Sequence, residues 1–385
     1  MRIVAIHERT VPVGSAMRNA AISFGGMTAS ALAIVTDHLV EGQPVIGYAF
    51  DSIGRYGKGG LLRERFVPRL LAAPATSLQG TDGLLDPAAC WRTAMRDEKD
   101  GGHGERAGAI GLIDAAVWDA LAKARREPLW RTLAAAHGVA DANPLIATYG
   151  SCGHFQAASG NQGLQDELRA ALDLGYRTLK IKVDGRDTAA DSNRVEAALA
   201  VLPAASQLAI DANGRADADD ATWIRAMAGF CLAWLEEPVS ALDYAALARF
   251  VQQYAGPVAT GENLFSAADA INLYRYGGLR PALDRIQVDM LLAYGMPEYR
   301  RILDAGTSHG WQRRAYWPHA GHLFAAHVVA AMGLGSHESA PDASRLYGGY
   351  WDGTRVEDGA VRIPDLPGVG YEAKANLYAV LRALA

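Results

Sequence analysis

Much of the first 50 residues alternates between apolar and polar positions, the pattern of a β-strand with one buried face. The alternation covers residues 2–9 and 31–50. The turn-forming letters EGQ interrupt the second stretch, so it predicts a β-hairpin. Residues 59–73 and 107–127 instead space apolar residues three or four positions apart, as in a helix with one buried face. We therefore expect an α+β unit up to about residue 125.

Between about residues 140 and 345 the chain repeats a short apolar run followed by an amphipathic helical pattern. The apolar runs that we interpret as strands are PLIATYG (144–150), TLKIKVD (178–184), QLAIDAN (207–213), LAWLEEP (232–238), PVATGEN (257–263), DRIQVD (284–289), RAYWPH (314–319) and MGLGSHES (332–339). Eight strands joined by helices match a (β/α)8 barrel, and an open doubly wound sheet is the alternative. No strand is followed by Gly-x-Gly-x-x-Gly and no P-loop occurs, so a signal for nucleotide binding is missing.

Composition narrows the class of protein. The 385 residues suffice for two domains, or for one large barrel with a cap. Residues 346–385 are rich in glycine and proline and too few to fold alone, so we expect them to pack back on the first region. The net charge of −5 gives no indication of a nucleic-acid partner. The sequence contains no apolar run of about 20 residues, so it predicts no membrane span. Three separated cysteines and the absence of a signal-peptide pattern predict a cytoplasmic protein with reduced thiols.

Acidic or basic residues end six consecutive predicted strands. They are Lys182, Asp211, Glu236, Glu262, Asp289 and His319. Their spacing of about one strand–helix unit brings them to one ring, and in a barrel that ring is the mouth where catalysis takes place. Any one such residue could simply cap a helix or face solvent, but six in a row favour a site.

Three of these residues, Asp211, Glu236 and Glu262, are carboxylates on neighbouring strands. Without a counter-charge they would repel one another, and a bound divalent cation removes that repulsion. A ligand set made only of oxygens favours Mg²⁺ over Zn²⁺, and Mn²⁺ could substitute. Glu237 points to the opposite face of its strand, so only one glutamate of the pair can be a ligand. Asn213 and Arg215 are candidates for supporting the ligands.

Two lysines lie two positions apart on one strand. Side chains at that spacing share a face, so Lys180 and Lys182 both point into the barrel. Burial and mutual repulsion favour the neutral amine, and we expect a lowered lysine pKa suited to a base. The alternative is a strand at the barrel edge with both lysines solvated.

A predicted acid lies opposite the lysines. A carboxylate at Asp289 would orient the ring of His319 and raise its pKa, which suits a general acid. His322 and His327 fall on the next predicted helix, where we interpret them as structural. Glu338, at the end of the eighth strand, could hydrogen-bond an oxyanion.

The ordered motifs KIK, DANGR, WLEEP, TGENLF and PHAGH resemble the enolase superfamily, mandelate racemase subgroup. The stretch AAVWDALAKARREPLW is similar to the helix that joins that family's capping domain to its barrel, and the resemblance covers nearly the whole chain. Within the subgroup the chain resembles the D-tartrate dehydratases. The stretches that carry this resemblance are MRNAAISF, GRYGKGGLLRERF, EKDGGHGER, RYGGLRP and PDLPGVGYE.

The resemblance implies an α+β capping domain in residues 1–125 and a modified (β/α)8 barrel in residues 126–345. Residues 346–385 would return to the cap. It also implies substrates that are small carboxylates, whose α-proton is removed to give an enediolate, and a homo-oligomer between a dimer and an octamer.

The resemblance assigns roles to most of the candidate residues. It implies Mg²⁺ on Asp211, Glu236 and Glu262. It further implies Lys182 as the base and His319 as the acid, held by Asp289. Lys180 would lie against the substrate carboxylate, and Asn19 and Lys99 of the cap would bind its far end.

The reaction that we expect is the dehydration of tartrate to oxaloacetate. Dehydration of another acid sugar, or racemisation or epimerisation of a 2-hydroxy acid, is the alternative within the superfamily. A sugar-acid-binding protein without catalysis is the alternative outside it, and loss of a metal carboxylate or of the lysine pair would be its sign. Ile53 departs from the tartrate enzymes, where we expect a polar amide, and this departure puts the substrate in doubt.

Overall fold

The alternating N-terminal stretch forms a three-stranded antiparallel sheet. The sheet has the order β1 (Ile3–Pro12), β2 (Thr28–Val40) and β3 (Gln43–Phe50). Glu41 and Gly42, between β2 and β3, both have positive φ, as a tight two-residue hairpin turn requires. The predicted hairpin is therefore confirmed. The computed structural model describes residues 1–385 except residues 16, 100–103 and 156–159.

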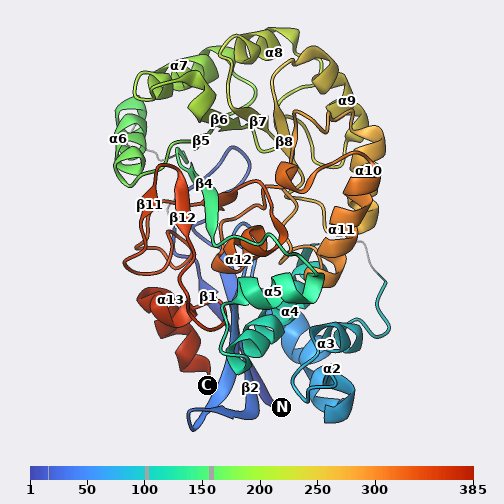
Figure 1. Ribbon diagram of the computed structural model, residues 1–385. Coiled ribbons are helices and arrows are strands. Elements are labelled where there is room, and N and C mark those ends of the chain that lie inside the picture. Colours follow the sequence, from blue (N-terminus) through green and yellow to red (C-terminus); the bar gives the residue numbers. More distant parts are fainter. Residues whose placement is uncertain (16, 100–103, 156–159) are drawn as a thin grey trace.

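Helices cover this sheet and join it to the barrel (Figure 1). They are α1 (Gly59–Leu61), α2 (Val67–Ala72), α3 (Pro87–Ala94), α4 (Gly104–Ala124) and α5 (Leu129–His137). Helix α4 is buried on nearly every side because it packs on β2 and β3 and also on the barrel. A Cβ at Gly111 of α4 would lie 2.1 Å from the carbonyl oxygen of Leu291, so only glycine allows this close approach.

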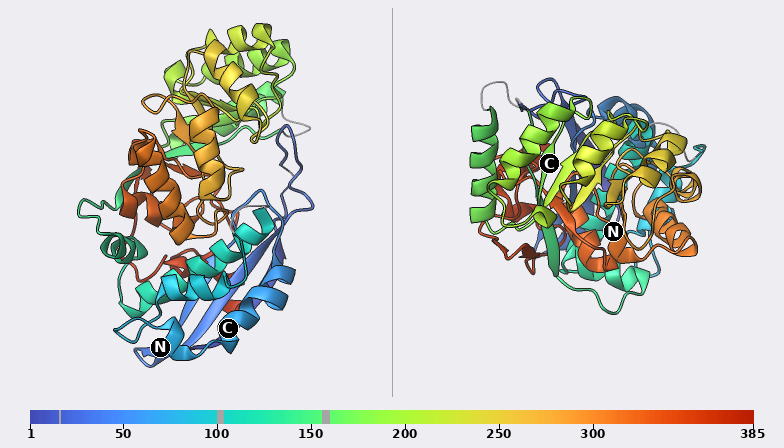
Figure 2. Two further views of the ribbon diagram at one scale, coloured as in Figure 1. Left: turned by 90° about the vertical axis from the view of Figure 1, so that its right-hand side faces the viewer. Right: turned by 90° about the horizontal axis from the view of Figure 1, so that it is seen from above.

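The second region closes into a barrel of parallel strands ringed by helices (Figures 1 and 2). The strands are β4 (Leu145–Ser151), β5 (Leu179–Lys182), β6 (Leu208–Asp211), β7 (Trp234–Glu236), β8 (Val258–Thr260), β9 (Arg285–Ile286) and β10 (His337–Ser339). The helices are α6 (Gly160–Asp173), α7 (Thr188–Leu199), α8 (Ala221–Ala228), α9 (Tyr244–Gln253), α10 (Ala267–Tyr276), α11 (Met296–Ser308) and α12 (Leu323–Met332). Strand β10 pairs with β4, and a modified (β/α)8 barrel with a cap is confirmed.

The seventh predicted strand, residues 314–319, differs from the pattern. Its only pairing in the described chain is one isolated bridge between Tyr316 and Ile286. Pro318 has no N–H for a ladder, and Ala320 and Gly321 both take positive φ and turn the chain. Residues 317–322 therefore form a loop, and this loop carries His319.

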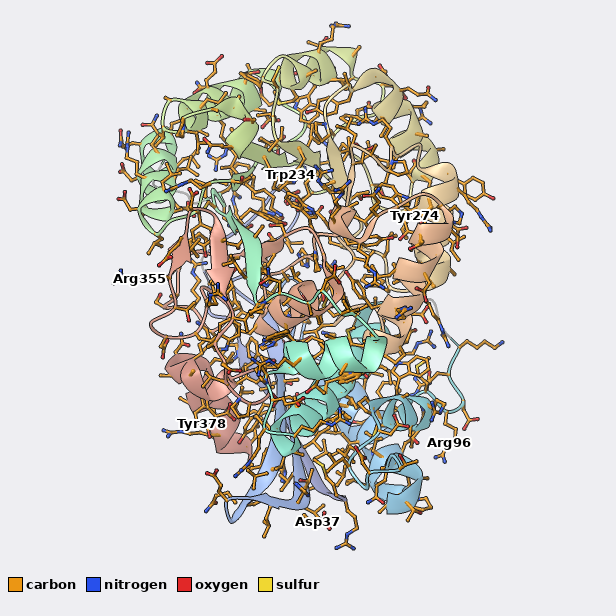
Figure 3. The ribbon with its side chains drawn as sticks, viewed as in Figure 1. Asp37, Arg96, Trp234, Tyr274, Arg355 and Tyr378 are labelled. Carbon is orange, nitrogen blue, oxygen red and sulfur yellow. The ribbon has the colours of Figure 1, made fainter. Side chains whose placement is uncertain are left out.

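The C-terminal segment forms β11 (Val356–Glu357), β12 (Ala360–Arg362) and α13 (Ala375–Leu381). Helix α13 packs on β2 and β3, with the rings of Tyr378 and Tyr48 6.0 Å apart, and both termini lie at this end of the molecule (Figures 1 and 3). All three cysteines are free thiols. Among the described residues, no helix has the length and apolar character needed to cross a bilayer.

Asp114 of α4 makes stability depend on pH. Its Oδ2 accepts from the backbone N–H of Met296 (2.7 Å), Oδ1 has no partner among the described residues, and burial raises its pKa to about 7. The folded state therefore keeps a proton that the unfolded state loses near pH 4, so stability falls as pH rises from about 4 to 7. We expect Asp114→Asn to exceed the wild type in unfolding free energy above pH 7, by up to about 4 kcal/mol. Denaturant unfolding at pH 5 and pH 8 checks this, and a pH-independent difference would contradict it.

Candidate active site

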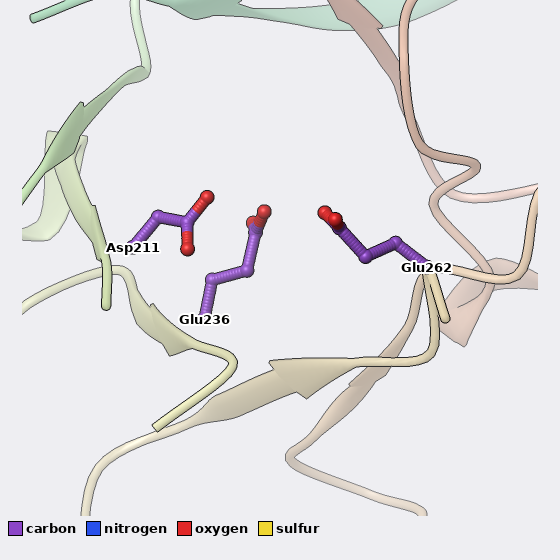
Figure 4. A group of neighbouring side chains, drawn as sticks. All are labelled: Asp211, Glu236 and Glu262. Carbon is purple, nitrogen blue, oxygen red and sulfur yellow. The ribbon is translucent and has the colours of Figure 1, made fainter. Parts of the chain in front are cut away.

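Three carboxylates converge at the carboxyl ends of neighbouring strands (Figure 4). Asp211 and Glu236 are the last residues of β6 and β7 and are paired in register, and Glu262 follows β8 by two residues. One oxygen of each lies within 4.8 Å of the others, and all three side chains are buried. We call Asp211, Glu236 and Glu262 the carboxylate triad.

The surrounding side chains hold the carboxylate triad in place. Glu236 Oε2 accepts from Gln287 Nε2 (2.6 Å) and from Trp234 Nε1 (3.1 Å), and Trp234 lies inside the barrel (Figure 3).

Asp211 Oδ1 accepts from the backbone N–H of Asn213 (2.8 Å), so the supporting role expected of Asn213 is confirmed. Arg215 makes no such contact with the triad. It donates to the capping-loop carbonyl of Ala20 and forms an ion pair with Asp184.

The two glutamates of WLEEP have different partners. Glu237 accepts from Asn263 Nδ2 (2.8 Å) and is not part of the carboxylate triad, as the strand pattern predicts. Burial, followed by the charge of Glu262, raises the pKa of Glu237 well above its usual range. Burial also raises the pKa of Glu236, to about 7, against the opposing charge of Lys180. A set of three buried oxygen donors with supporting hydrogen bonds fits a hard divalent cation.

Both lysines of KIK point at the carboxylates. Lys180 Nζ contacts Glu236 and lies 2.9 Å from Glu338 Oε1, and Lys182 Nζ contacts Asp211. Burial acts to lower the pKa of each lysine, but the neighbouring carboxylates outweigh it and raise both values. The expected lowering is therefore wrong for this arrangement, because it considered the second lysine and burial but not the number of acids within reach.

Asp289 lies beside two histidines and a capping-loop serine. His319 Nδ1 lies 3.7 Å from Asp289 Oδ2, and Ser52 Oγ donates to that same oxygen (2.5 Å). His322 Nε2 lies 3.0 Å from Asp289 Oδ1. Because the backbone N–H of Ala325 donates to His322 Nδ1 (3.1 Å), the ring proton of His322 is on Nε2 and is donated to Asp289. Asp289 thus accepts hydrogen bonds from Ser52 and His322 and lies close to His319, whose Nδ1 has no hydrogen-bond partner among the described residues.

His322 caps α12 and also orients Asp289, a contact that its position on a helical pattern did not reveal. Of these two histidines, His319 is the one that lines the cavity of the site, with Nε2 3.4 Å from Glu262 Oε2. Burial acts to lower the pKa of His319, but Glu262 and Asp289 outweigh it and raise the value, as predicted.

Glu338 lies between a lysine and a loop. Oε1 is 2.9 Å from Lys180 Nζ, and Oε2 accepts from the backbone N–H of Ala320 (3.0 Å). Against the effect of burial, Lys180 and His319 hold the pKa of Glu338 well below its usual range. In this arrangement Glu338 is a partner of Lys180, and its expected hydrogen bond to an oxyanion stays a prediction.

A cavity of about 230 Å³ connects the barrel mouth to the capping loops. Its lining includes Lys182, Glu262, His319 and Glu338 from the barrel, and Asn19 and Ile53 from the cap. Asn19 Oδ1 accepts from the backbone N–H groups of Ala21 and Ile22. Lys99 is exposed and is not among the residues that line the cavity, so its proposed contact with substrate stays a prediction.

The cavity lining also contains polar residues that the sequence did not single out. His154 follows β4, Arg55 comes from the cap, and Asp342 and Arg345 follow β10. The sequence could have identified His154 in the same way as the residues that end the strands, because it lies three positions after a strand. Arg345 lies in a loop without periodicity, where the sequence offers no such signal.

Comparisons with known proteins agree with this geometry. Residues 163–377 match the family described as enolase C-terminal domain-like. The chain is 28% identical over 271 residues to the 3,6-anhydro-α-L-galactonate cycloisomerase of Streptomyces coelicolor, covering 70% of each chain. It is 22% identical over 285 residues to the arabinonate dehydratase of Saccharolobus solfataricus, covering 72% of this chain and 73% of that protein.

Two further similarities are to one kind of enzyme. The L-talarate/galactarate dehydratase of Salmonella typhimurium is 30% identical over 227 residues, which is 59% of this chain and 54% of that protein. The crystal structure of L-talarate dehydratase from Polaromonas sp. JS666, complexed with Mg and L-glucarate, superposes with a TM-score of 0.72 at 23% identity. The superposition covers 96% of this chain and 95% of that one, and it indicates a shared fold.

Proposed function

We propose that this chain, which belongs to the enolase superfamily through its enolase C-terminal domain-like region at residues 163–377, is a Mg²⁺-dependent acid-sugar dehydratase. Two of the relatives above are named as dehydratases of arabinonate and of L-talarate/galactarate, and a third as a cycloisomerase. These names support an enzyme that acts on small sugar acids. The expected type of enzyme is a carbon–oxygen lyase.

One observation carries the proposal. A single buried mouth brings together the carboxylate triad, a lysine and a histidine–aspartate pair. Lys182 and His319 both line the cavity, so a substrate bound there can meet a base and an acid together. No nucleophile is needed for removal of an α-proton followed by loss of a β-hydroxyl.

The carboxylate triad would hold the Mg²⁺. Its three oxygen donors, of which those of Asp211 and Glu236 are fixed by hydrogen bonds, suit that ion better than a softer metal. Bound there, Mg²⁺ supplies a positive charge that stabilises the carboxylate of the substrate as it gains negative charge.

Lys182 acts as the base in the proposed reaction. Asp211 outweighs Lys180 and holds the pKa of Lys182 above its usual value, so the amine has to release a proton before it can act as the base. A cation held by the carboxylate triad would offset the charge of Asp211 and favour the neutral amine. The neutral amine takes the proton from C2 of the acid, and the electron pair of the C2–H bond moves toward the carboxylate to give an enediolate. That electron pair then forms the C2–C3 double bond as the C3–O bond breaks. Lys180, anchored by Glu338, contributes a positive charge beside the site that receives the substrate carboxylate.

His319 acts as the acid. Its raised pKa keeps a proton available, and Asp289 lies close enough to Nδ1 to favour a ring orientation with Nε2 toward the cavity side. His319 gives that proton to the C3 hydroxyl, which leaves as water when the C3–O bond breaks. The resulting enol takes a proton from solvent at C3 and becomes a 2-keto-3-deoxy acid.

Tartrate is the substrate that the sequence resemblance suggests, and its product would be oxaloacetate. Ile53 lines the cavity, where it offers no hydrogen bond to a hydroxyl or carboxylate. The reaction class does not depend on that residue, but the choice among acid sugars does.

The proposal is tested by assaying keto-acid formation with Mg²⁺-loaded protein. The panel contains the three tartrate stereoisomers, five- and six-carbon aldonic acids, and the corresponding diacids. We expect keto acid from at least one of them, and none after chelation of the metal. Absence of turnover across the whole panel would contradict the dehydratase proposal.

Racemisation or epimerisation is the second candidate function. The base Lys182 and the acid His319 could also remove a proton from one face of C2 and return one to the other. A solved relative with a TM-score of 0.75 and 23% identity is described as a racemase from Streptomyces coelicolor A3(2) with bound magnesium. Formation of an epimer without keto acid would favour this reaction.

A further inference from the structure

The cavity has a second group of polar side chains that the mechanism above does not use. They are His154, Asn19, Asp342 and Arg345, which we call the distal subsite. In the described chain, their side-chain hydrogen bonds go to one another or to nearby loop residues, and none goes to the carboxylate triad. They line the same cavity as Lys182 and His319, so a substrate that reaches the base can also reach them.

His154 presents an uncommitted ring to the cavity. Its neighbour Gly153 accepts from the backbone N–H of Lys182 (3.2 Å), which places His154 next to the predicted base. The ring packs edge-on against Phe24, with centroids 5.9 Å apart, and neither ring nitrogen has a hydrogen-bond partner among the described residues. Burial and the nearby lysines lower the pKa of His154 to about 3, so the neutral ring offers one donor and one acceptor at pH 7.

Arg345 and Asp342 offer donors and acceptors side by side. Arg345 Nε donates to Asp342 Oδ2 (2.8 Å), and Nη1 donates to Tyr347 Oη (3.2 Å). Arg345 Nη2 has no partner within the part of the chain that the structure describes. Hydrogen bonds from Ser344 and Arg345 hold the pKa of Asp342 low, so its carboxylate is charged and accepts hydrogen bonds.

The chemistry of these groups matches a hydroxyl better than a second carboxylate. A hydroxyl both donates and accepts, so it can use the ring of His154 and the adjoining pair of Arg345 and Asp342. A carboxylate only accepts. It would also lie beside the charged Asp342, which already occupies one edge of the guanidinium.

We infer that the distal subsite binds the hydroxyl groups of an uncharged chain, with His154 as the specificity-determining residue, so that the substrate is an aldonic acid and not a diacid. This inference rests on the proposed function and narrows its substrate class. It favours a monocarboxylic sugar acid over tartrate, in keeping with the apolar Ile53 in the same cavity.

The test compares each aldonic acid with the diacid that has the same carbon chain and hydroxyl configuration. With Mg²⁺-loaded wild-type protein, we expect kcat/KM to be at least about 10-fold higher for the aldonic acid, the discrimination that one or two hydrogen bonds provide. His154→Phe keeps the ring contact with Phe24 but removes both hydrogen-bonding atoms. It should lower kcat/KM for the aldonic acid about 10- to 100-fold, mostly through KM.

Two further variants control for structural effects. His154→Gln keeps a donor and an acceptor and should recover most of the lost KM. His309→Phe makes the same chemical change at a histidine on the C-terminal end of α11, bonded to the carbonyl of Ala305 and outside the cavity lining, and should leave KM unchanged.

The outcomes distinguish failure of the distal-subsite inference from failure of the dehydratase proposal. Preference for the diacid, or an unchanged KM in His154→Phe that thermal unfolding shows to be folded, would overturn the distal subsite while the dehydratase remains. No keto acid from any acid sugar would overturn the dehydratase first, and the inference with it.

Discussion

Replacing Lys182 with alanine is expected to lower kcat by about 10²- to 10⁴-fold, the contribution of a positioned general base. It should also abolish exchange of the substrate α-proton with solvent deuterium. Among the described residues, Lys182 and Lys180 are the lysines that contact the carboxylate triad, and Lys182 is the one that lines the cavity. The exchange is measured by proton NMR of the substrate recovered from D₂O.

The control must account for the loss of a buried ion pair. Removing Lys182 leaves Asp211 without its lysine, which alone can destabilise the fold. Lys123 of α4 forms a comparable pair with Asp119, 2.8 Å apart, in the cap. Lys123→Ala should therefore reduce stability but retain exchange. Retained exchange in Lys182→Ala would reassign the base.

Replacing Glu236 with glutamine is expected to weaken Mg²⁺ binding by at least about 100-fold, because changes to groups that only support a ligand already cost 10- to 100-fold. Glu236 is the central member of the carboxylate triad, and its loss removes one of three negative charges at the proposed metal position. Calorimetric titration with Mg²⁺ measures the affinity without relying on turnover. Activity should fall with the same Mg²⁺ dependence.

Glu237→Gln is the matched control, because it makes the same change at the next residue. Glu237 is equally buried but bonds Asn263 instead of joining the carboxylate triad. We expect its Mg²⁺ affinity to stay within a few-fold of the wild type. Equal losses in the two variants, or wild-type affinity in Glu236→Gln, would contradict the assignment of the metal site.

The carboxylate triad could be predicted from the sequence because residues that end successive parallel strands lie close together in space. Lys182, Asp211 and Glu236 each end a strand, and the in-register pairing of β5, β6 and β7 places them side by side. The cap could be predicted because an alternating stretch precedes helical patterns in the first region. The barrel could be predicted because the second region repeats an apolar run followed by a helical pattern. No step of that reasoning required knowledge of the loops.

Other features depended on contacts that spacing does not encode. The pKa of Lys180 depends on how many carboxylates surround it, and Glu338 reaches it from the other end of the barrel sequence. His322 appeared structural on a helical pattern, yet its position at the N-cap of α12 directs the ring to Asp289. His154 and Arg345 lie in loops, whose course is set by packing against the cap rather than by periodicity.

The central claim is that this site removes an α-proton and then expels a β-hydroxyl. Its most direct test is NMR of the reaction in D₂O, with Mg²⁺-loaded protein and each acid sugar of the panel in turn. The mechanism predicts a 2-keto-3-deoxy acid with one deuterium at C3, because the enol takes its last proton from solvent. Accumulation of substrate or its epimer with deuterium at C2, without any keto acid, would contradict it.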